Sequence, residues 1–269
     1  MMINQVRRKL ERDEVVMGMM HFTGSPMIVE VMARAGLDFF IIDMEHSPID
    51  VSLAAHLVRT GDAAGITPFV RVPEVNAGLI KKLLNLGAQG IVVPHADRES
   101  AQAAVRAAWY EPAGIRGSCP AIRSANYGPD EGWDSFQEAE NGEVMVIPLI
   151  EDTSTLEDFE ALADTPGLDV FFLGPFDYSV SAGVPGATFD HPVMAATIER
   201  MVEVASSRGK YVMTSVGDRI DADYGRGIID KGVRMISYSA DALVFLGACR
   251  EVAALKTALD LNPRSVKEA

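Results

Sequence analysis

Short apolar runs separated by amphipathic segments constrain the fold of this chain more than any other feature. Most of the runs are rich in Val, Ile and Phe, and none exceeds eight residues. A strand that helices cover on both faces reads as such an uninterrupted run, as in a parallel sheet. Eight of these runs occur: Val15–Met20, Phe39–Asp43, Thr67–Val72, Gly90–Pro94, Val144–Glu151, Asp169–Gly174, Tyr211–Val216 and Met235–Ser239.

Helical patterns fill the gaps between the predicted strands. Ser25 and Pro26 suit the N-cap and the first position of a helix, and Gly36 follows its last residue. A final helix is predicted over Asp241–Leu259. The remaining predicted helices are Val51–Thr60, Asn76–Leu86, Arg98–Trp109, Thr153–Ala163, Pro192–Ser207 and Arg219–Lys231.

Eight strand signals, each followed by a helix signal, predict an α/β fold of the (β/α)8 TIM-barrel type, as a single domain over residues 1–269. A doubly wound sheet is the alternative. It is disfavoured because no G-x-G-x-x-G motif opens a helix, and Gly225-Arg226-Gly227 lies inside a predicted one. The segment 110–133 is rich in Gly and Pro and longer than an ordinary barrel connection, so we expect a lid, a binding loop or a partner contact there.

Composition excludes several classes of protein. The chain is 48% hydrophobic and 23% charged, as globular proteins are, and no apolar run approaches the roughly 18 residues of a membrane span. Two cysteines cannot build a disulfide framework, so we expect a soluble cytoplasmic enzyme. A net charge of −14 disfavours nucleic acid as a partner, and an anionic substrate would need local cations to hold it.

Polar residues at the carboxyl ends of the strands are the candidates for chemistry, because that end of a barrel carries the active site. Glu151 and Asp177 end two consecutive strands and should be lateral neighbours. Two carboxylates without an adjacent Cys or His suit a hard divalent ion, Mg²⁺ or Mn²⁺. The alternative is that each carboxylate caps the helix that follows it.

Arg71 and His46 also follow predicted strands, and each has two interpretations. The planar guanidinium of Arg71 suits a substrate carboxylate, but it could equally pair with Glu45 or Asp43. Imidazole exchanges protons near neutral pH, so His46 is a candidate general base. A histidine in such a place is also commonly a hydrogen-bonded structural residue.

Six segments together resemble the HpcH/HpaI aldolase family of metal-dependent (class II) pyruvate aldolases, which includes enzymes for 4-hydroxy-2-oxoheptanedioate and 2-dehydro-3-deoxyglucarate. The similarity runs in order from about Val15 to Leu259. Its most specific parts are the D-x-E-H-[SA]-P and G-P-x-D-x-S patterns. The segments are IIDMEHSP (41–48), VRVP (70–73), LGAQGIVVPHAD (86–97), GIRGSCP (114–120), PLIED (148–152) and FLGPFDYS (172–179).

The resemblance implies roles for residues that match the family pattern. Glu151 and Asp177 match the metal ligands, with Mg²⁺ as the expected ion and Mn²⁺ or Co²⁺ as alternatives. Arg71 matches the arginine that holds the carboxylate and keto oxygen of pyruvate. His46 matches the catalytic histidine, and Asp43 the acidic residue before it.

The pattern also implies a substrate-binding turn, and the chain departs from the pattern at two positions. Gly174 and Pro175, followed by Phe176, match a turn whose backbone N–H groups lie near the substrate carboxylate. Asn85 stands where familiar members have an aspartate that supports the histidine, and we expect it to orient His46 without adding charge. Leu149 stands where the family often has Gln, which removes a hydrogen bond at the mouth of the site.

The implied reaction is reversible aldol cleavage of a 4-hydroxy-2-oxo acid to pyruvate, or a hydroxypyruvate-like donor, and an aldehyde through a metal-stabilised enolate. The aldehyde end is expected to lie against the segment 111–133 or a neighbouring subunit. One alternative is enolate chemistry on another electrophile, such as oxaloacetate decarboxylation or acyl-CoA condensation or lysis. The other is a non-catalytic keto-acid binder.

The resemblance also implies a homo-oligomer, because family members form hexamers with the C-terminal helix packed on a neighbour. The predicted helix over Asp241–Leu259 carries apolar residues that could serve such a contact. They could equally close the chain's own barrel.

Overall fold

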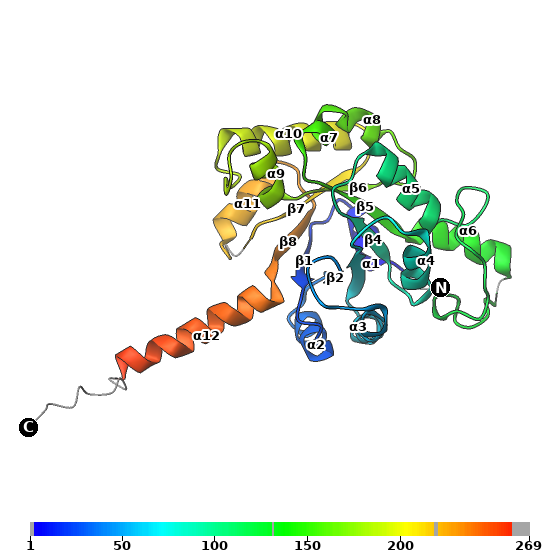
Figure 1. Ribbon diagram of the computed structural model, residues 1–269, viewed down its shortest axis with the longest axis horizontal. Helices are drawn as coiled ribbons and strands as arrows, with labels where there is room; N and C mark the ends of the chain where they lie inside the picture. Colours follow the sequence, from blue (N-terminus) through cyan, green and yellow to red (C-terminus); the bar gives the residue numbers. More distant parts are fainter. Residues whose placement is uncertain (1–2, 131, 218–219, 260–269) are drawn as a thin grey trace, which may run out of the picture.

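Eight parallel strands close into a barrel in sequence order in the computed structural model, which describes residues 3–130, 132–217 and 220–259 (Figure 1). The predicted (β/α)8 fold is therefore confirmed. The strands are β1 (Val16–His21), β2 (Phe39–Asp43), β3 (Thr67–Arg71), β4 (Gly90–Val93), β5 (Met145–Ile150), β6 (Val170–Leu173), β7 (Tyr211–Ser215) and β8 (Met235–Ala240).

Helices surround the barrel, and most of them match the predicted segments. The segment predicted as one helix over Thr153–Ala163 is broken at Asp158 into α7 and α8, and the predicted start at Arg219 lies outside the described residues. The predicted helices are α2 (Pro26–Arg34), α3 (Val51–Ala64), α4 (Ala77–Asn85), α5 (Arg98–Ala108), α7 (Thr153–Glu157), α8 (Phe159–Ala163), α10 (Pro192–Ser206), α11 (Ala222–Asp230) and α12 (Asp241–Ala258). Four further elements have no counterpart in the prediction: α1 (Gln5–Leu10), η1 (Arg123–Ala125), α6 (Trp133–Glu143) and α9 (Pro175–Ser181).

The alternation of side chains along each strand divides the core into two layers. On β2, Phe39 and Ile41 belong to the cluster inside the barrel, whereas Phe40 and Ile42 pack against the surrounding helices. The same alternation directs Asp43, the last residue of β2, toward the barrel axis. The polar residues that end the strands are therefore delivered to one central space.

The amino-terminal end of the barrel is closed by α1 and by the segment before β5. Val6 and Leu10 of α1 are fully buried in the interior cluster. The N–H of Asn4 donates to Glu143 Oε2 of α6 at 2.8 Å. Asn126, in the segment 110–133, lines the same hollow as Thr67, where β3 begins. Helix α1 thus closes the barrel interior at this end.

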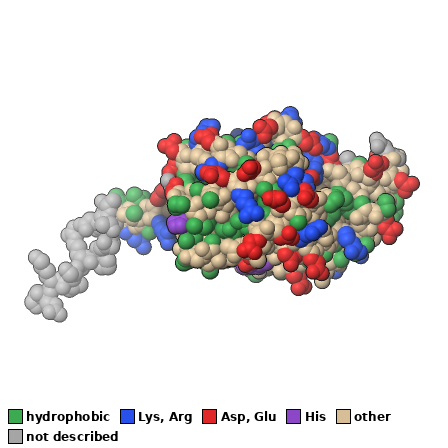
Figure 2. Space-filling model, turned by 90° about the horizontal axis from the view of Figure 1, so that it is seen from above, with side chains coloured by type: hydrophobic (Ala, Val, Ile, Leu, Met, Phe, Trp, Pro, Cys, Tyr) green, Lys and Arg blue, Asp and Glu red, His purple; other side chains and the backbone are tan. Residues whose placement is uncertain are grey.

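Helix α12 points away from the barrel and contacts it only at its base, against β1 and β8 (Figure 1). Figure 2 shows it standing clear of the body of the molecule, with apolar side chains on its surface. It therefore does not close its own barrel, which was one of the two expectations. The exposed apolar residues of this segment are Leu243, Val244, Phe245, Leu246, Val252, Leu255 and Leu259. None of the helices in the described ranges is long and apolar enough to cross a membrane.

Candidate active site at the carboxyl end of the barrel

A cavity of about 560 Å³ opens at the carboxyl ends of the strands. It brings together most of the residues that the sequence singled out, from β2, β3, β5 and the segment after β6. The lining residues are Met20, Phe22, His46, Arg71, Leu149, Glu151, Phe172, Gly174, Pro175, Phe176, Asp177, Ser215, Gly217, Ser239, Ala240 and Leu243.

Arg71 is held at the cavity by two acids from the neighbouring strand end. Its Nη2 donates to Asp43 Oδ2 at 2.5 Å and its Nε to Asp43 Oδ1 at 3.2 Å, while Nη1 lies 3.2 Å from Glu45 Oε2. Asp43 also accepts the backbone N–H groups of Glu45 and His46. The structure therefore contains the predicted salt bridges, and they fix a guanidinium that still lines the cavity.

His46 lies at the rim of the cavity. Its side chain is 58% exposed, and its Nε2 lies 3.5 Å from Glu45 Oε2. Asp43 contacts the backbone of His46 and the side chain of Arg71, so its observed contacts position both residues. The imidazole is thus accessible to a substrate while one of its nitrogens faces an acid.

Glu151 is the buried carboxylate of the site, with only 5% of its surface exposed. Burial raises the pKa of Glu151, and the nearby charges of Asp177 and Glu45 raise it further. The His95 backbone N–H, which donates to Oε2 at 2.9 Å, and the His95 side chain oppose this shift. Negative charge at Glu151 is therefore incompletely compensated within the chain.

A divalent cation fits the oxygen donors at this place. Glu151 and Asp177 both line the cavity, and a cation between them would relieve the repulsion that raises the pKa of Glu151. Among the described residues, no group of three or more His, Cys, Asp or Glu side chains forms a complete cage. Mg²⁺ is commonly bound by one or two carboxylates, with coordination positions left for water and substrate oxygens.

The turn after β6 brings the backbone close to Glu151. A Cβ at Gly174 would lie 2.8 Å from Glu151 Cγ and 3.1 Å from Leu149 Cδ1, so only glycine leaves room for both side chains. Pro175 then occupies the first turn of α9, and Asp177 is the acid of that turn. Gly174, Pro175, Phe176 and Leu149, all predicted to contact substrate, line the cavity.

Asn85 is the one predicted catalytic residue that the structure puts elsewhere. It ends α4, and its Oδ1 accepts hydrogen bonds from Nη2 and Nε of Arg116 at 3.0 and 3.3 Å. It is not among the residues that line the cavity. A helix of a barrel runs antiparallel to its strands, so its last residue lies at the amino-terminal end. Within one chain, the expected support of His46 by Asn85 is therefore not observed.

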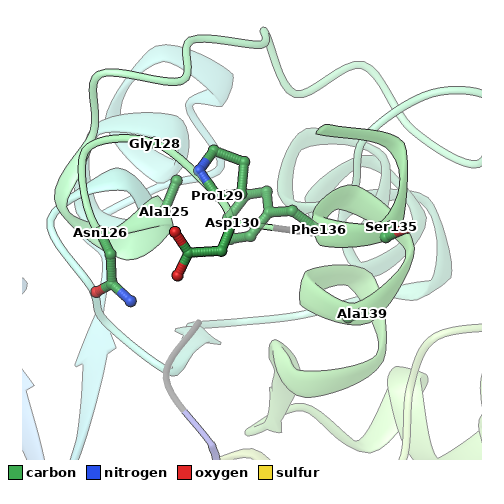
Figure 3. Close-up of a pocket in the computed structure, with 8 residues that line it drawn as sticks. All are labelled: Ala125, Asn126, Gly128, Pro129, Asp130, Ser135, Phe136 and Ala139. Carbon is green, nitrogen blue, oxygen red and sulfur yellow. The ribbon is translucent and has the colours of Figure 1, made fainter. Parts of the chain in front are cut away.

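The segment 110–133 also departs from the expectation of a lid. It lies between α5 and α6, the helix that leads into β5, which places it at the amino-terminal end, and none of its described residues lines the cavity. It carries a separate hollow of about 230 Å³, in which Asp130 and Asn126 are the most polar neighbours (Figure 3). Within one chain, the aldehyde end of a substrate cannot lie against this segment.

Sequence reasoning gave too little weight to two residues near Glu151. Glu45 adds a negative charge near Glu151. It follows Asp43 by two residues, a spacing that indicates that the two acids lie on the same side of the chain. His95 supplies the backbone N–H, with Nδ1 3.5 Å from Glu151 Oε2 and a positive φ of 42°. No pattern of side-chain types reveals a backbone donor of this kind.

Comparisons with known proteins agree with the fold and show the family. The model of the HpcH/HpaI aldolase/citrate lyase family matches residues 17–248. The chain is 32% identical over 255 residues to the hydroxypyruvate/pyruvate aldolase of Paraburkholderia phytofirmans, covering 92% of this chain and 95% of that protein. It is 29% identical over 251 residues to the 5-keto-4-deoxy-D-glucarate aldolase of Escherichia coli, covering 93% and 95%.

Solved structures give the same result. The HpcH/HpaI aldolase from Desulfitobacterium hafniense superposes with a TM-score of 0.86 at 28% identity, over 93% of this chain and 96% of that one. The citrate synthase SbnG superposes with a TM-score of 0.80 at 30% identity, over 94% and 98%.

Proposed function

The chain belongs to the HpcH/HpaI aldolase/citrate lyase family and is an enzyme of the aldolase type, and we propose that it cleaves a 4-hydroxy-2-oxo acid reversibly to an aldehyde and pyruvate, or a hydroxypyruvate-like donor. One observation carries the proposal: Arg71, His46, Glu151 and Asp177 line a single cavity at the carboxyl end of the barrel. Together they offer an anion-binding fork, a proton acceptor and two hard oxygen ligands.

Arg71 binds the pyruvyl half of the substrate. Asp43 and Glu45 hold its guanidinium in one orientation, so little side-chain freedom is lost when a substrate oxygen accepts from it. As the C3–C4 bond breaks, its electron pair stays on the pyruvyl half as an enolate. A fixed cation beside the keto oxygen favours that charge as it develops.

Glu151 and Asp177 would hold the divalent cation, with Mg²⁺ proposed and Mn²⁺ or Co²⁺ as alternatives. When bound, such an ion acts as a Lewis acid toward the keto oxygen. Among the described residues, Arg71 at the polar end of the cavity is paired with Asp43 and Glu45, and Glu151 and Asp177 also line the cavity. A bound cation would offset the repulsion between these carboxylates and an anionic substrate.

His46 takes up the proton that the C4 hydroxyl loses when the aldehyde forms. Its imidazole is exposed at the cavity rim, where a substrate hydroxyl can reach it, and Glu45 Oε2 lies 3.5 Å from Nε2. In the reverse direction the same group returns the proton to the new hydroxyl. No lysine lines the cavity, so the described site offers no amine for a Schiff base.

Exchange of the pyruvate methyl protons in D₂O, followed by NMR, tests the proposal. We expect exchange that needs Mg²⁺ or Mn²⁺ after chelation of the protein, because exchange reports enolate formation without any aldehyde. The matching retro-aldol assay should release pyruvate from 4-hydroxy-2-oxo acids. Absence of exchange with every divalent metal would contradict the assignment.

A second candidate is enolate chemistry on another electrophile, and the 30% identity to the citrate synthase SbnG favours it as the alternative. Decarboxylation of oxaloacetate and condensation or lysis of acyl-CoA belong to this class. Metal-dependent pyruvate exchange together with flat retro-aldol assays would select it. A keto-acid binder without catalysis would give no exchange.

Self-association through α12 is part of the same proposal. Its exposed apolar residues beyond Leu243, which lines the cavity, extend away from the barrel, and a second copy of the chain would bury them. Cys119 and Cys249 are free and exposed, which suits the reducing cytoplasm that we propose as its location. Sedimentation of the full chain beside a Phe245→Glu variant would test the assembly.

A further inference from the structure

The two sides of the active-site cavity differ in chemistry. Its charged residues follow β2, β3, β5 and β6. Because the barrel closes β8 onto β1, those two strand ends form a separate side of the cavity. That side carries the side chains of Met20, Phe22, Ala240 and Leu243.

The floor of the cavity is apolar as well. Leu149 and Phe172 line it and are only 1% and 4% exposed. Leu149 lies directly beneath the catalytic end, since a Cβ on Gly174 would lie 3.1 Å from its Cδ1. A substrate held by Arg71 and Glu151 therefore meets hydrocarbon as soon as it extends beyond the charged groups.

The cavity has room for such an extension. One water molecule occupies about 30 Å³ in the liquid, so a cavity of 560 Å³ holds a molecule several times larger than pyruvate. The space beyond the pyruvyl position is the place of the acceptor aldehyde, or of the carbons beyond C3 in an intact oxo acid.

Hydrogen-bond partners for that part of the substrate are few. On the side formed by β7, β8 and β1, the described lining side chains that carry hydroxyls are Ser215 and Ser239. A substrate hydroxyl that leaves water without gaining a partner weakens binding, whereas each buried methylene strengthens it about fourfold. A substrate with a hydroxyl on every carbon is therefore mismatched to this wall.

We infer that the acceptor half of the substrate is apolar: an unsubstituted alkyl or aryl aldehyde, rather than a polyhydroxylated or carboxylated one. The inference rests on the proposed aldolase function, because it takes the charged end of the cavity as the pyruvyl position. It assigns substrate selection to Met20, Phe22, Leu149 and Leu243.

Binding of two six-carbon oxo acids tests this inference without turnover. The probes are 2-oxohexanoate and 5,6-dihydroxy-2-oxohexanoate, which share one carbon skeleton and differ in the hydroxyls at C5 and C6. Both lack the C4 hydroxyl that retro-aldol cleavage requires. Isothermal titration of the Mg²⁺-loaded full chain should show at least tenfold tighter binding of 2-oxohexanoate. Equal binding, or tighter binding of the dihydroxy acid, would overturn the inference.

A pair of methionine variants links the preference to the wall. Met20→Gln, inside the cavity, should reduce the ratio of the two affinities at least fivefold. Met27→Gln, on the 71% exposed side chain of α2, should leave the ratio unchanged. If Met20→Gln does not fold, Leu243→Gln replaces it, because that side chain is half exposed. An unchanged ratio in the folded cavity variant would contradict the role of this wall.

The reaction in the aldol (synthetic) direction tests the apolar-acceptor inference separately from the aldolase proposal. Pyruvate is combined either with propanal or with glyceraldehyde, two aldehydes of equal length. We expect a higher kcat/KM for propanal. Metal-dependent pyruvate exchange with a preference for glyceraldehyde would overturn the apolar-acceptor inference and leave the aldolase proposal standing. Tighter binding of 2-oxohexanoate without any exchange would contradict the aldolase proposal and support the apolar wall.

Discussion

Buried glutamates lie at both ends of the barrel, and two of them, Glu140 and Glu151, are compensated in different ways. Glu140, at the amino-terminal end, is 4% exposed and lies 3.3 Å from Nη2 of Arg116, whose side chain is fully buried. Glu151, at the carboxyl end, is 5% exposed, and the carboxylates of Asp177 and Glu45 lie near it. Burial is the main cause that raises the pKa of both.

The difference identifies which buried charge stabilises the fold and which one serves chemistry. Arg116 lowers the pKa of Glu140 against the effect of burial, stacks 4.5 Å from the Tyr110 ring and donates to Asn85. Glu140 thus has a cationic partner within the chain, and the cluster anchors the segment before α6. Among the described residues, Glu151 has no guanidinium partner of this kind, and we propose that a bound cation compensates its charge.

Replacing Glu151 should have the largest effect. Glu151→Gln removes one of two proposed cation ligands, and we expect kcat/KM for aldol cleavage to fall by about 10³ or more, because the stabilisation of the enolate charge is lost. Steady-state kinetics at saturating Mg²⁺ measure this. A variant within tenfold of the wild type would remove Glu151 from the reaction.

Replacing Glu140 should instead destabilise the fold. Glu140→Gln leaves the buried Arg116 guanidinium without its acid, at a cost of about 3 kcal/mol in the free energy of unfolding. Urea denaturation measures this loss, with the exposed Glu138→Gln on the same helix as control. The folded fraction should keep its kinetics. A loss of activity at unchanged stability would reverse the contrast between the two ends.

Arg71→Lys sharpens the comparison at the carboxyl end. Lysine keeps the positive charge but not the planar fork that Asp43 and Glu45 orient, so kcat/KM should fall by about 100-fold. Arg71→Met should fall further, because it also removes the charge. Wild-type activity in both variants would mean that neither the fork nor the charge acts on the substrate.

Asp241 predicts a smaller, pH-dependent effect. Burial would raise its pKa, but His21 Nδ1 at 2.9 Å, Thr23 Oγ1 and the Phe22 N–H together hold the pKa well below its usual value. A carboxyl with a depressed folded pKa stabilises the protein above the ordinary Asp pKa, and this stabilisation is lost as pH falls below about 5.

Thermal denaturation between pH 7 and pH 3 checks this effect. The wild type should lose about 1 kcal/mol more stability over that range than Asp241→Asn does. Asp134→Asn, on an exposed carboxyl of α6, should follow the wild type. Parallel curves for all three proteins would contradict the role of Asp241.

The strands were predictable from the sequence because burial on both faces leaves little ambiguity. The observed bounds of all eight strands lie within one residue of the predicted runs at each end. Helix α6 was not predicted, since WDSFQEAENGE is largely polar and buries only Phe136, Glu140 and Glu143. Two of those three are charged residues, whose burial depends on contacts with Arg116 and Asn4 that local periodicity cannot reveal.

The candidate site was partly predictable, and its errors have one cause. Glu151, Asp177, Arg71 and His46 were found by asking which residues follow strands, and they share the cavity. Asn85 and the segment 110–133 follow helices, which in a barrel end on the opposite side. Applying that rule to them would have removed both from the site of a single chain.

Titration with Mn²⁺, followed by electron paramagnetic resonance of the free ion, tests the central contrast most directly. We predict one tight Mn²⁺ per chain in the wild type and in Glu140→Gln, and loss of that binding in Glu151→Gln. Retention of tight binding in Glu151→Gln would contradict the claim that the buried charge at the carboxyl end is compensated by a cation.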